Sequence, residues 1–249
     1  MRIYELENQD DQDIPVRRLK KNVNPRFKGA PKTYTMGSGA ATSVFQKQNK
    51  PHEVMKITRH LTTLRGSMLI NFLQMCIKNE GNPFLPAIYS IKVLQKPDGS
   101  YLVYVETEVL KTFDDLNWKQ ISYLYNTLLG DNMQHVYSLY TDVPEGEGKW
   151  YNKYEAINTL VHIISARLDY DETRLRNPHS ETGKYFQDKG IKIQSSLALK
   201  AIRQIASVMN TVPGTINDLS INNIMFRTTP YGVQLVITDP LHKWSDIGK

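Results

Sequence analysis

The feature that most constrains the fold of this chain is a change in hydrophobic spacing near residue 110. Before that point, short runs of alternating or clustered apolar residues predict strands, with one helix among them. After it, apolar residues three and four positions apart predict helices, and two short apolar runs near the end predict a hairpin. This order indicates an α+β protein with a small antiparallel part followed by a mainly helical part. The predicted strands cover residues 32–58, 87–95, 100–107, 223–227 and 233–238, and the predicted helices cover 60–79, 114–129, 151–168 and 193–210.

The domain organisation follows from the same change of pattern. Residues 1–30 are polar, first acidic and then basic, and prolines interrupt them, so we expect an irregular arm outside the core. Residues 31–108 then form the small lobe of a bilobal chain, and residues 109–249 form its helical lobe. A length of 249 residues is sufficient for two such lobes.

Charge and cysteine content narrow the possible partners. The formal net charge of +6 favours anionic partners such as nucleotides, nucleic acid or acidic proteins. Part of the excess lies in the arm, at Arg17, Arg18, Lys20 and Lys21, where we favour a solvated segment over a nucleic-acid contact because no aromatic residues are interleaved. With one cysteine, Cys76, and no signal-peptide or membrane-spanning run, we expect a cytoplasmic protein without a membrane partner.

Two features of the first part could bind phosphate. Gly37, Ser38 and Gly39 lie between two predicted strands, where glycine lets backbone N–H groups approach phosphate oxygens before the chain resumes a strand at Val44. A strand and not a helix follows, so this is not a dinucleotide-binding fingerprint. Lys56 lies within an apolar strand shortly afterwards. Taken singly, the first feature is more often a simple turn and the second a solvent-facing lysine.

The strongest motif lies near the end of the chain. Asp218 and Asn223 are five positions apart after the last predicted helix, and Asp239 follows the predicted hairpin. A loop and the end of a hairpin can bring an amide oxygen and a carboxylate to one hard cation such as Mg²⁺. Taken alone, each of these residues is more simply explained as an unrelated polar residue in a turn. That explanation does not account for all three in this order after a long amphipathic helix.

Together these motifs resemble the protein kinase-like superfamily, in the right order over about residues 33–240. Asp-x-x-x-x-Asn has the spacing of a kinase catalytic loop, and the later aspartate stands where a Mg²⁺-binding carboxylate belongs. The segments Asn223-Ile-Met-Phe226 and Ile237-Thr-Asp239-Pro240 are most similar to the short early serine/threonine kinases of tailed bacteriophages.

The resemblance implies a bilobal kinase-like fold and ATP-dependent phosphorylation of host proteins, with host transcription or RNA metabolism as the target. It implies ATP and Mg²⁺ as cofactors, and adenine bonded to backbone near residues 105–109, at the end of the strand that carries Glu106. Asp218 would accept the hydroxyl proton, and Asn223 and Asp239 would hold the metal. The expected nucleotide-binding residues are Gly37, Ser38, Gly39, Val44, Lys56 and Glu106.

The sequence also departs from the kinase pattern. Ile216 and Asn217 replace the usual His-Arg before the catalytic aspartate, and the helix at 60–79 has no central glutamate, so Asn71 or Gln74 would be the nearest substitutes to pair with the active-site lysine. Two alternatives therefore stay open. One is a small-molecule phosphotransferase of the aminoglycoside or choline kinase type, and the other is a pseudokinase that acts as a binding module.

Overall fold

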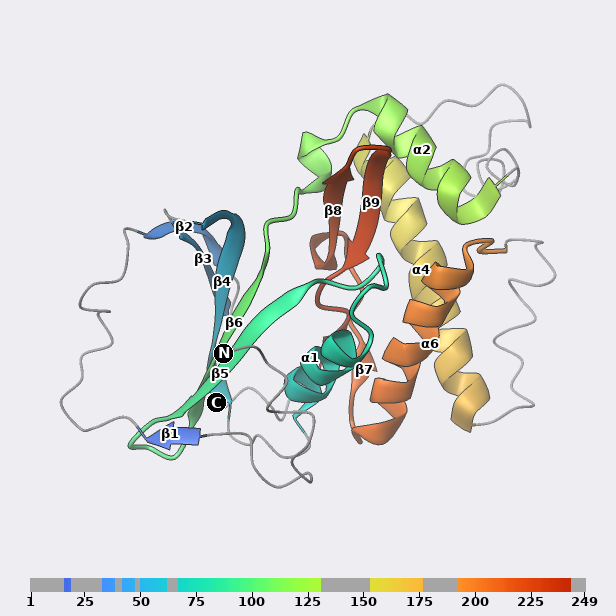
Figure 1. Ribbon diagram of the computed structural model, residues 1–249. Helices are drawn as coiled ribbons and strands as arrows, with labels where there is room; N and C mark the ends of the chain where they lie inside the picture. The colour runs from blue at the N-terminus through green and yellow to red at the C-terminus, as the bar shows by residue number, and fades with distance from the viewer. Residues whose placement is uncertain are drawn as a thin grey trace. The chain divides into compact units, whose positions relative to one another are not determined.

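The computed structural model describes residues 16–18, 33–38, 42–47, 50–61, 67–130, 153–176 and 192–242, and these form an α+β protein (Figure 1). The chain divides into two compact units. The first holds the described residues up to Glu80 together with Ala87–Val109, and the second holds Gly81–Pro86 and Leu110–His242. The chain therefore leaves the first unit for six residues and returns to it before it enters the second unit for good.

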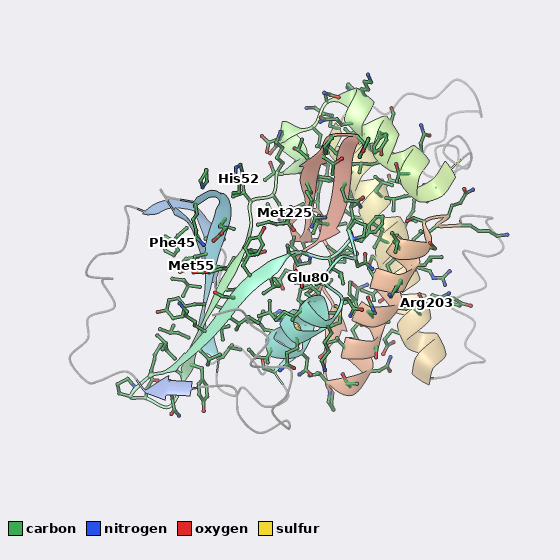
Figure 2. All side chains as sticks on the ribbon, in the orientation of Figure 1. Phe45, His52, Met55, Glu80, Arg203 and Met225 are labelled. Carbon is green, nitrogen blue, oxygen red and sulfur yellow. The ribbon has the colours of Figure 1, made fainter. Side chains whose placement is uncertain are left out.

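A six-stranded sheet dominates the first unit. Its strand order is β1-β5-β6-β4-β3-β2, and all neighbours are antiparallel except β1 and β5. The strands from β2 to β4 form a continuous meander, in which Phe45 on β3 lies opposite Met55 on β4 (Figure 2). The strands are β1 (Val16–Arg18), β2 (Thr33–Ser38), β3 (Thr42–Lys47), β4 (Lys50–Leu61), β5 (Ile88–Gln95) and β6 (Tyr101–Glu108).

The hairpin between β5 and β6 confirms the two strands predicted at 87–95 and 100–107, and its turn lies at Pro97-Asp-Gly-Ser100. The Oδ1 atom of Asp98 accepts hydrogen bonds from the backbone N–H and the hydroxyl of Ser100, at 2.9 and 2.6 Å. Gly99 has a φ of 83°, which only glycine adopts without strain. These local interactions fix the register of the two strands, and the residues that make them can be recognised in the sequence as turn residues.

Helix α1 (Met68–Lys78) packs on this sheet. Ile70 and Leu73 of the helix join Leu61, Val93 and Val103 of the strands in one buried apolar cluster. The helix was predicted to begin at residue 60, and that boundary is wrong. Strand β4 continues through Leu61, which pairs with Tyr101 of β6 and is buried, so cross-strand pairing and burial override the local helical spacing.

In the part of the second unit that the structure describes, three helices and a hairpin form the core. A 3-10 turn, η2 (Phe113–Asp115), leads into α2, which packs against β9, and α4 and α6 pack along each other (Figure 1). Buried residues recur every three or four positions on α6, from Ala198 to Met209, as predicted. The helices are α2 (Trp118–Leu129), α4 (Lys153–Arg176) and α6 (Ser196–Thr211).

Helix α4 is longer than the pattern of apolar residues indicated. The predicted helix ended at residue 168, but α4 continues through Arg176. The Arg167 guanidinium donates two hydrogen bonds to the Asp171 carboxylate, both 3.1 Å long, and its Cζ lies 5.1 Å from the centre of the Tyr170 ring. Such polar pairs three and four residues apart stabilise helix without an apolar stripe. Residues 131–152 and 177–191, on either side of this helix, lie outside the described residues.

The last elements of the second unit are two short two-stranded sheets. Strand β7 (Ile216–Asn217) pairs with β10 (Leu241–His242), and β8 (Ile224–Thr229) pairs with β9 (Gly232–Ile237), which confirms the predicted hairpin. A 3-10 turn, η5 (Ile221–Asn223), stands between β7 and β8.

The N-terminal arm differs in one place from the irregular segment predicted for residues 1–30. Val16–Arg18 form β1, a strand parallel to β5 at the edge of the sheet. The other residues of the arm lie outside the described part of the chain. Among the helices that the structure describes, none combines the length and apolar character that crossing a membrane requires.

Candidate functional site

The second unit brings Asp218, Asn223 and Asp239 together around two strand ends. Asp218 directly follows β7, Asn223 ends η5 and enters β8, and Asp239 lies between β9 and β10. Because β7 pairs with β10 and β8 pairs with β9, the segments before and after the hairpin meet. Residues far apart in sequence thus share one small region of the second unit.

Hydrogen bonds through the main chain join the three segments directly. The backbone N–H of Asp218 donates to the carbonyl of Pro240 at 2.9 Å, and the Nδ2 amide of Asn223 donates to the carbonyl of Asp218 at 2.6 Å. Thr238 donates from its N–H and its hydroxyl to the carbonyl of Asn223, at 2.9 and 3.1 Å. The backbone on each side of Asp239 is therefore fixed to the loop that carries Asp218.

The side chains of this motif carry oxygen atoms of the kind that bind a hard cation. The side chains of Asp218 and Asp239 are exposed, and Asn223 is half-buried. Since the amide nitrogen of Asn223 is held by Asp218, its amide oxygen is the branch that a metal would take. Two protein oxygens suit Mg²⁺, which keeps waters or substrate phosphates as its other ligands. Within the described residues, no three His, Cys, Asp or Glu side chains form a fuller metal cluster.

The segment Gly81–Pro86 supports the hairpin that precedes Asp239. The N–H of Ile237 donates to the carbonyl of Phe84 at 2.9 Å. The Arg227 guanidinium donates from Nη1 to the carbonyl of Pro83 at 2.9 Å and from Nη2 to the carbonyl of Leu85 at 3.1 Å. Both strands of the hairpin are thus attached to a segment more than 140 residues earlier in the chain.

Asn217 attaches the loop from the other side, to helix α4. Its Nδ2 amide donates to the carbonyl and the hydroxyl of Ser165, at 3.2 and 2.8 Å, and to Oδ1 of Asp169 at 2.9 Å. Its Oδ1 accepts from the N–H of Leu219 at 3.0 Å. In the sequence, Asn217 stands out only as a departure from the kinase pattern. The available signal was the spacing of Ser165 and Asp169, which places both on one face of a helix.

Lys56 lies in the first unit, in the middle of β4. It stands opposite Val44 of β3 on one side and Val105 of β6 on the other, and it is half-buried. Glu106 is the next residue on β6 and lies opposite Met55. Lys56, Val44 and Glu106 thus share three adjacent strands of one sheet.

The helix partners considered for Lys56 are engaged elsewhere or exposed. The amide of Asn71 donates to the carbonyl of Ser67 within α1 at 2.8 Å, and Gln74 is exposed. Cys76 of the same helix is buried and lies within electrostatic reach of Lys56. Burial raises the pKa of the Cys76 thiol far above its usual range, and the charge of Lys56 offsets only part of that rise.

The glycine-rich segment is described in part. Gly37 and Ser38 end β2, and Gly37 stands opposite Val44 of β3. Gly39 lies outside the described residues. Of the two predicted phosphate-binding glycines, Gly37 therefore lies in the first strand of a β2–β3 hairpin.

No protein-family model matches the chain, and no curated protein matches it.

Proposed function

We propose that this protein is a bilobal, kinase-like phosphotransferase that moves the γ-phosphoryl group of ATP to serine or threonine hydroxyls of proteins. The observation that supports this best is the bonding of the Asp218 main chain to both Asn223 and Pro240, at 2.6 and 2.9 Å. It brings the two ends of an Asp-x-x-x-x-Asn loop next to the segment that carries Asp239. A kinase catalytic loop and its metal-binding aspartate require this proximity.

The placement of Lys56 supports the same proposal independently. Counted from Thr33, its strand is the third of an antiparallel meander that begins with the hairpin of Gly37. The phosphate-binding lysine of protein kinases stands on the third strand after such a hairpin. A lysine on a solvent-facing strand edge would lack this context, whereas Lys56 is half-buried between two other strands.

The proposed roles use the groups of this chain as follows. Lys56 binds the α- and β-phosphates, and backbone N–H groups near Gly37 and Ser38 cover the γ-phosphate. Asn223 and Asp239 hold Mg²⁺, which when bound neutralises charge on the phosphates. Asp218 is exposed and accepts the proton of the attacking hydroxyl, whose oxygen it orients for in-line transfer.

The class of substrate comes from the resemblance to early bacteriophage kinases. In this proposal the acceptors are host proteins of transcription or RNA metabolism, phosphorylated in the host cytoplasm. The alternatives, transfer to a small metabolite and nucleotide binding without transfer, predict different products from the same assay.

The test is transfer of labelled γ-phosphate from Mg·ATP to proteins of a bacterial cell extract. We expect discrete labelled bands with the wild type and a loss of at least about 100-fold in Asp218→Ala, because a positioned base contributes about 10²–10⁴-fold. Nucleotide binding should persist in Asp218→Ala and weaken in Lys56→Ala. Asp114→Ala and Lys119→Ala are matched controls, since both side chains are exposed on the second unit and neither belongs to the motif.

The outcomes separate the alternatives. Label on a metabolite and never on protein would replace the protein acceptor with a small molecule. Mg·ATP binding without any transfer would favour the pseudokinase, and full transfer by Asp218→Ala would refute the assignment of the base.

A further inference from the structure

The Asn217 side chain reaches helix α4 and donates hydrogen bonds to two of its residues, Ser165 and Asp169. Its backbone is already paired with Leu241 through β7 and β10. The side chain therefore adds a second attachment that the local sheet does not need. A residue placed directly before Asp218 with such an attachment can control where Asp218 stands.

The polarity of the site requires an amide at position 217. On one side the carbonyl and hydroxyl of Ser165 and the carboxylate of Asp169 surround the Nδ2 atom, so this branch must donate. On the other side the N–H of Leu219 points at Oδ1, so that branch must accept. An aspartate has the same shape but no donor, and it would set a carboxylate against the carboxylate of Asp169.

The consequence for the loop is geometric. The Asn217 side chain bridges from α4 to the N–H of Leu219, so its contacts bracket Asp218 from the residue before and the residue after. Asn223 and Pro240 then fix the carbonyl and the N–H of Asp218 itself, at 2.6 and 2.9 Å. The Asp218 backbone is thereby held on both flanks and at both of its polar atoms.

We propose that Asn217 is a positioning residue that sets the Asp218 carboxylate for phosphoryl transfer by tethering the loop to Ser165 and Asp169 of α4. This inference rests on the proposed function. In protein kinases the residue before the catalytic aspartate is usually arginine, and here an asparagine bound to the neighbouring helix takes that position. Asn217 itself acts only through Asp218.

The test exchanges the two partners. Asn217→Asp should lower kcat by about 10- to 100-fold while the KM for ATP changes less than about threefold, because a small misplacement of the base slows transfer without removing a nucleotide contact. Combining Asn217→Asp with Asp169→Asn restores a donor opposite an acceptor at unchanged net charge. We expect kcat of the double variant to be about tenfold higher than that of Asn217→Asp, which would show that the two neighbouring residues are coupled.

The controls separate positioning from stability. Asn126→Asp makes the same exchange at an exposed position of α2 and should retain wild-type kcat. If Asn217→Asp does not fold, Ser165→Ala removes one acceptor only and should lower kcat about two- to tenfold. A purely structural role would lower the melting temperature but leave kcat per folded molecule unchanged, and it would give no recovery in the exchanged pair.

Each result has a definite meaning. Full kcat in folded Asn217→Asp, with an active wild type, overturns the positioning role and leaves the proposed function standing. A wild type that transfers no phosphate overturns both. The tether itself is read by amide hydrogen exchange at Leu219, which should accelerate in Asn217→Ala, and equal rates in the two proteins would show that the bond is absent.

Discussion

Replacing Arg227 tests whether the segment Gly81–Pro86 belongs energetically to the second unit. Its guanidinium donates to the carbonyls of Pro83 and Leu85, at 2.9 and 3.1 Å, and it is half-buried. Arg227→Met keeps most of the apolar stem but removes both donors. A methionine therefore measures the contribution of the guanidinium group, to which these two hydrogen bonds belong.

The magnitude follows from the bonds lost. A hydrogen bond to a charged group contributes about 1.5–3 kcal/mol, and partial exposure at this site favours the lower end, so Arg227→Met should cost about 2–4 kcal/mol of the free energy of unfolding. For a chain of this size that corresponds to a fall of about 4–16 °C in melting temperature. Arg227→Lys can keep one of the two bonds and should cost about half as much.

The assay is denaturant unfolding of both variants beside Arg203→Met. Arg203 is exposed on α6 (Figure 2), so its replacement should change stability by less than about 0.5 kcal/mol. Because two units can unfold separately, hydrogen exchange of the Ile237 amide, which is bonded to Phe84, serves as the local readout. The reasoning would be refuted if the free energy of unfolding of Arg227→Met lay within about 0.5 kcal/mol of the wild type and the exchange rate of the Ile237 amide were unchanged.

Two further predictions concern Cys76 and Gly232. Since burial raises the pKa of the Cys76 thiol, the folded protein holds it neutral while the unfolded chain ionises it above about pH 8.5. The free energy of unfolding should therefore fall as the pH rises from about 8.5, by at most about 1.4 kcal/mol per pH unit. Unfolding curves should show this fall in the wild type and not in Cys76→Ala. An equal dependence on pH in the two proteins would contradict the prediction. Gly232 has a φ of 144°, and an added Cβ would lie 3.0 Å from the Tyr123 ring, whereas Gly99 has a φ of 83° and open space around it. Gly232→Ala should thus cost about 2–3 kcal/mol and Gly99→Ala about 1 kcal/mol in the same measurement, and the reverse order would show that the ring yields freely.

The sequence predicts those parts of the fold whose causes are local. The β5–β6 turn rests on Asp98 and Gly99, within the turn itself, and α6 rests on the spacing of its apolar residues. The start of α1 and the end of α4 were wrong because their causes lie elsewhere. Leu61 belongs to a strand through its pairing with β6, and Arg167 extends a helix by polar contacts that hydrophobic spacing does not register.

The candidate site shows the same division. The spacing of Asp218, Asn223 and Asp239 is visible in the sequence, and it selects the residues that the second unit brings together. The bonds from Asp218 to Pro240 and from Asn217 to Ser165 join segments more than 20 residues apart, and no local pattern encodes them. Spacing along the sequence therefore identifies the residues proposed to do chemistry more readily than those that hold them in place.

The detour of Gly81–Pro86 also has a consequence for the order in which the protein can fold during its synthesis. The described residues of the first unit end at Val109, but the carbonyl of Leu85 receives its hydrogen bond from Arg227, which is made 142 residues later. At about 5–20 residues per second, a ribosome needs roughly 7–28 s to supply that partner. During this interval the sheet of the first unit can form on both sides of the segment, while the carbonyls of Pro83 and Leu85 have only water to accept from. The second unit can therefore close only after its last hairpin has been made, so its completion comes late relative to the sheet of the first unit.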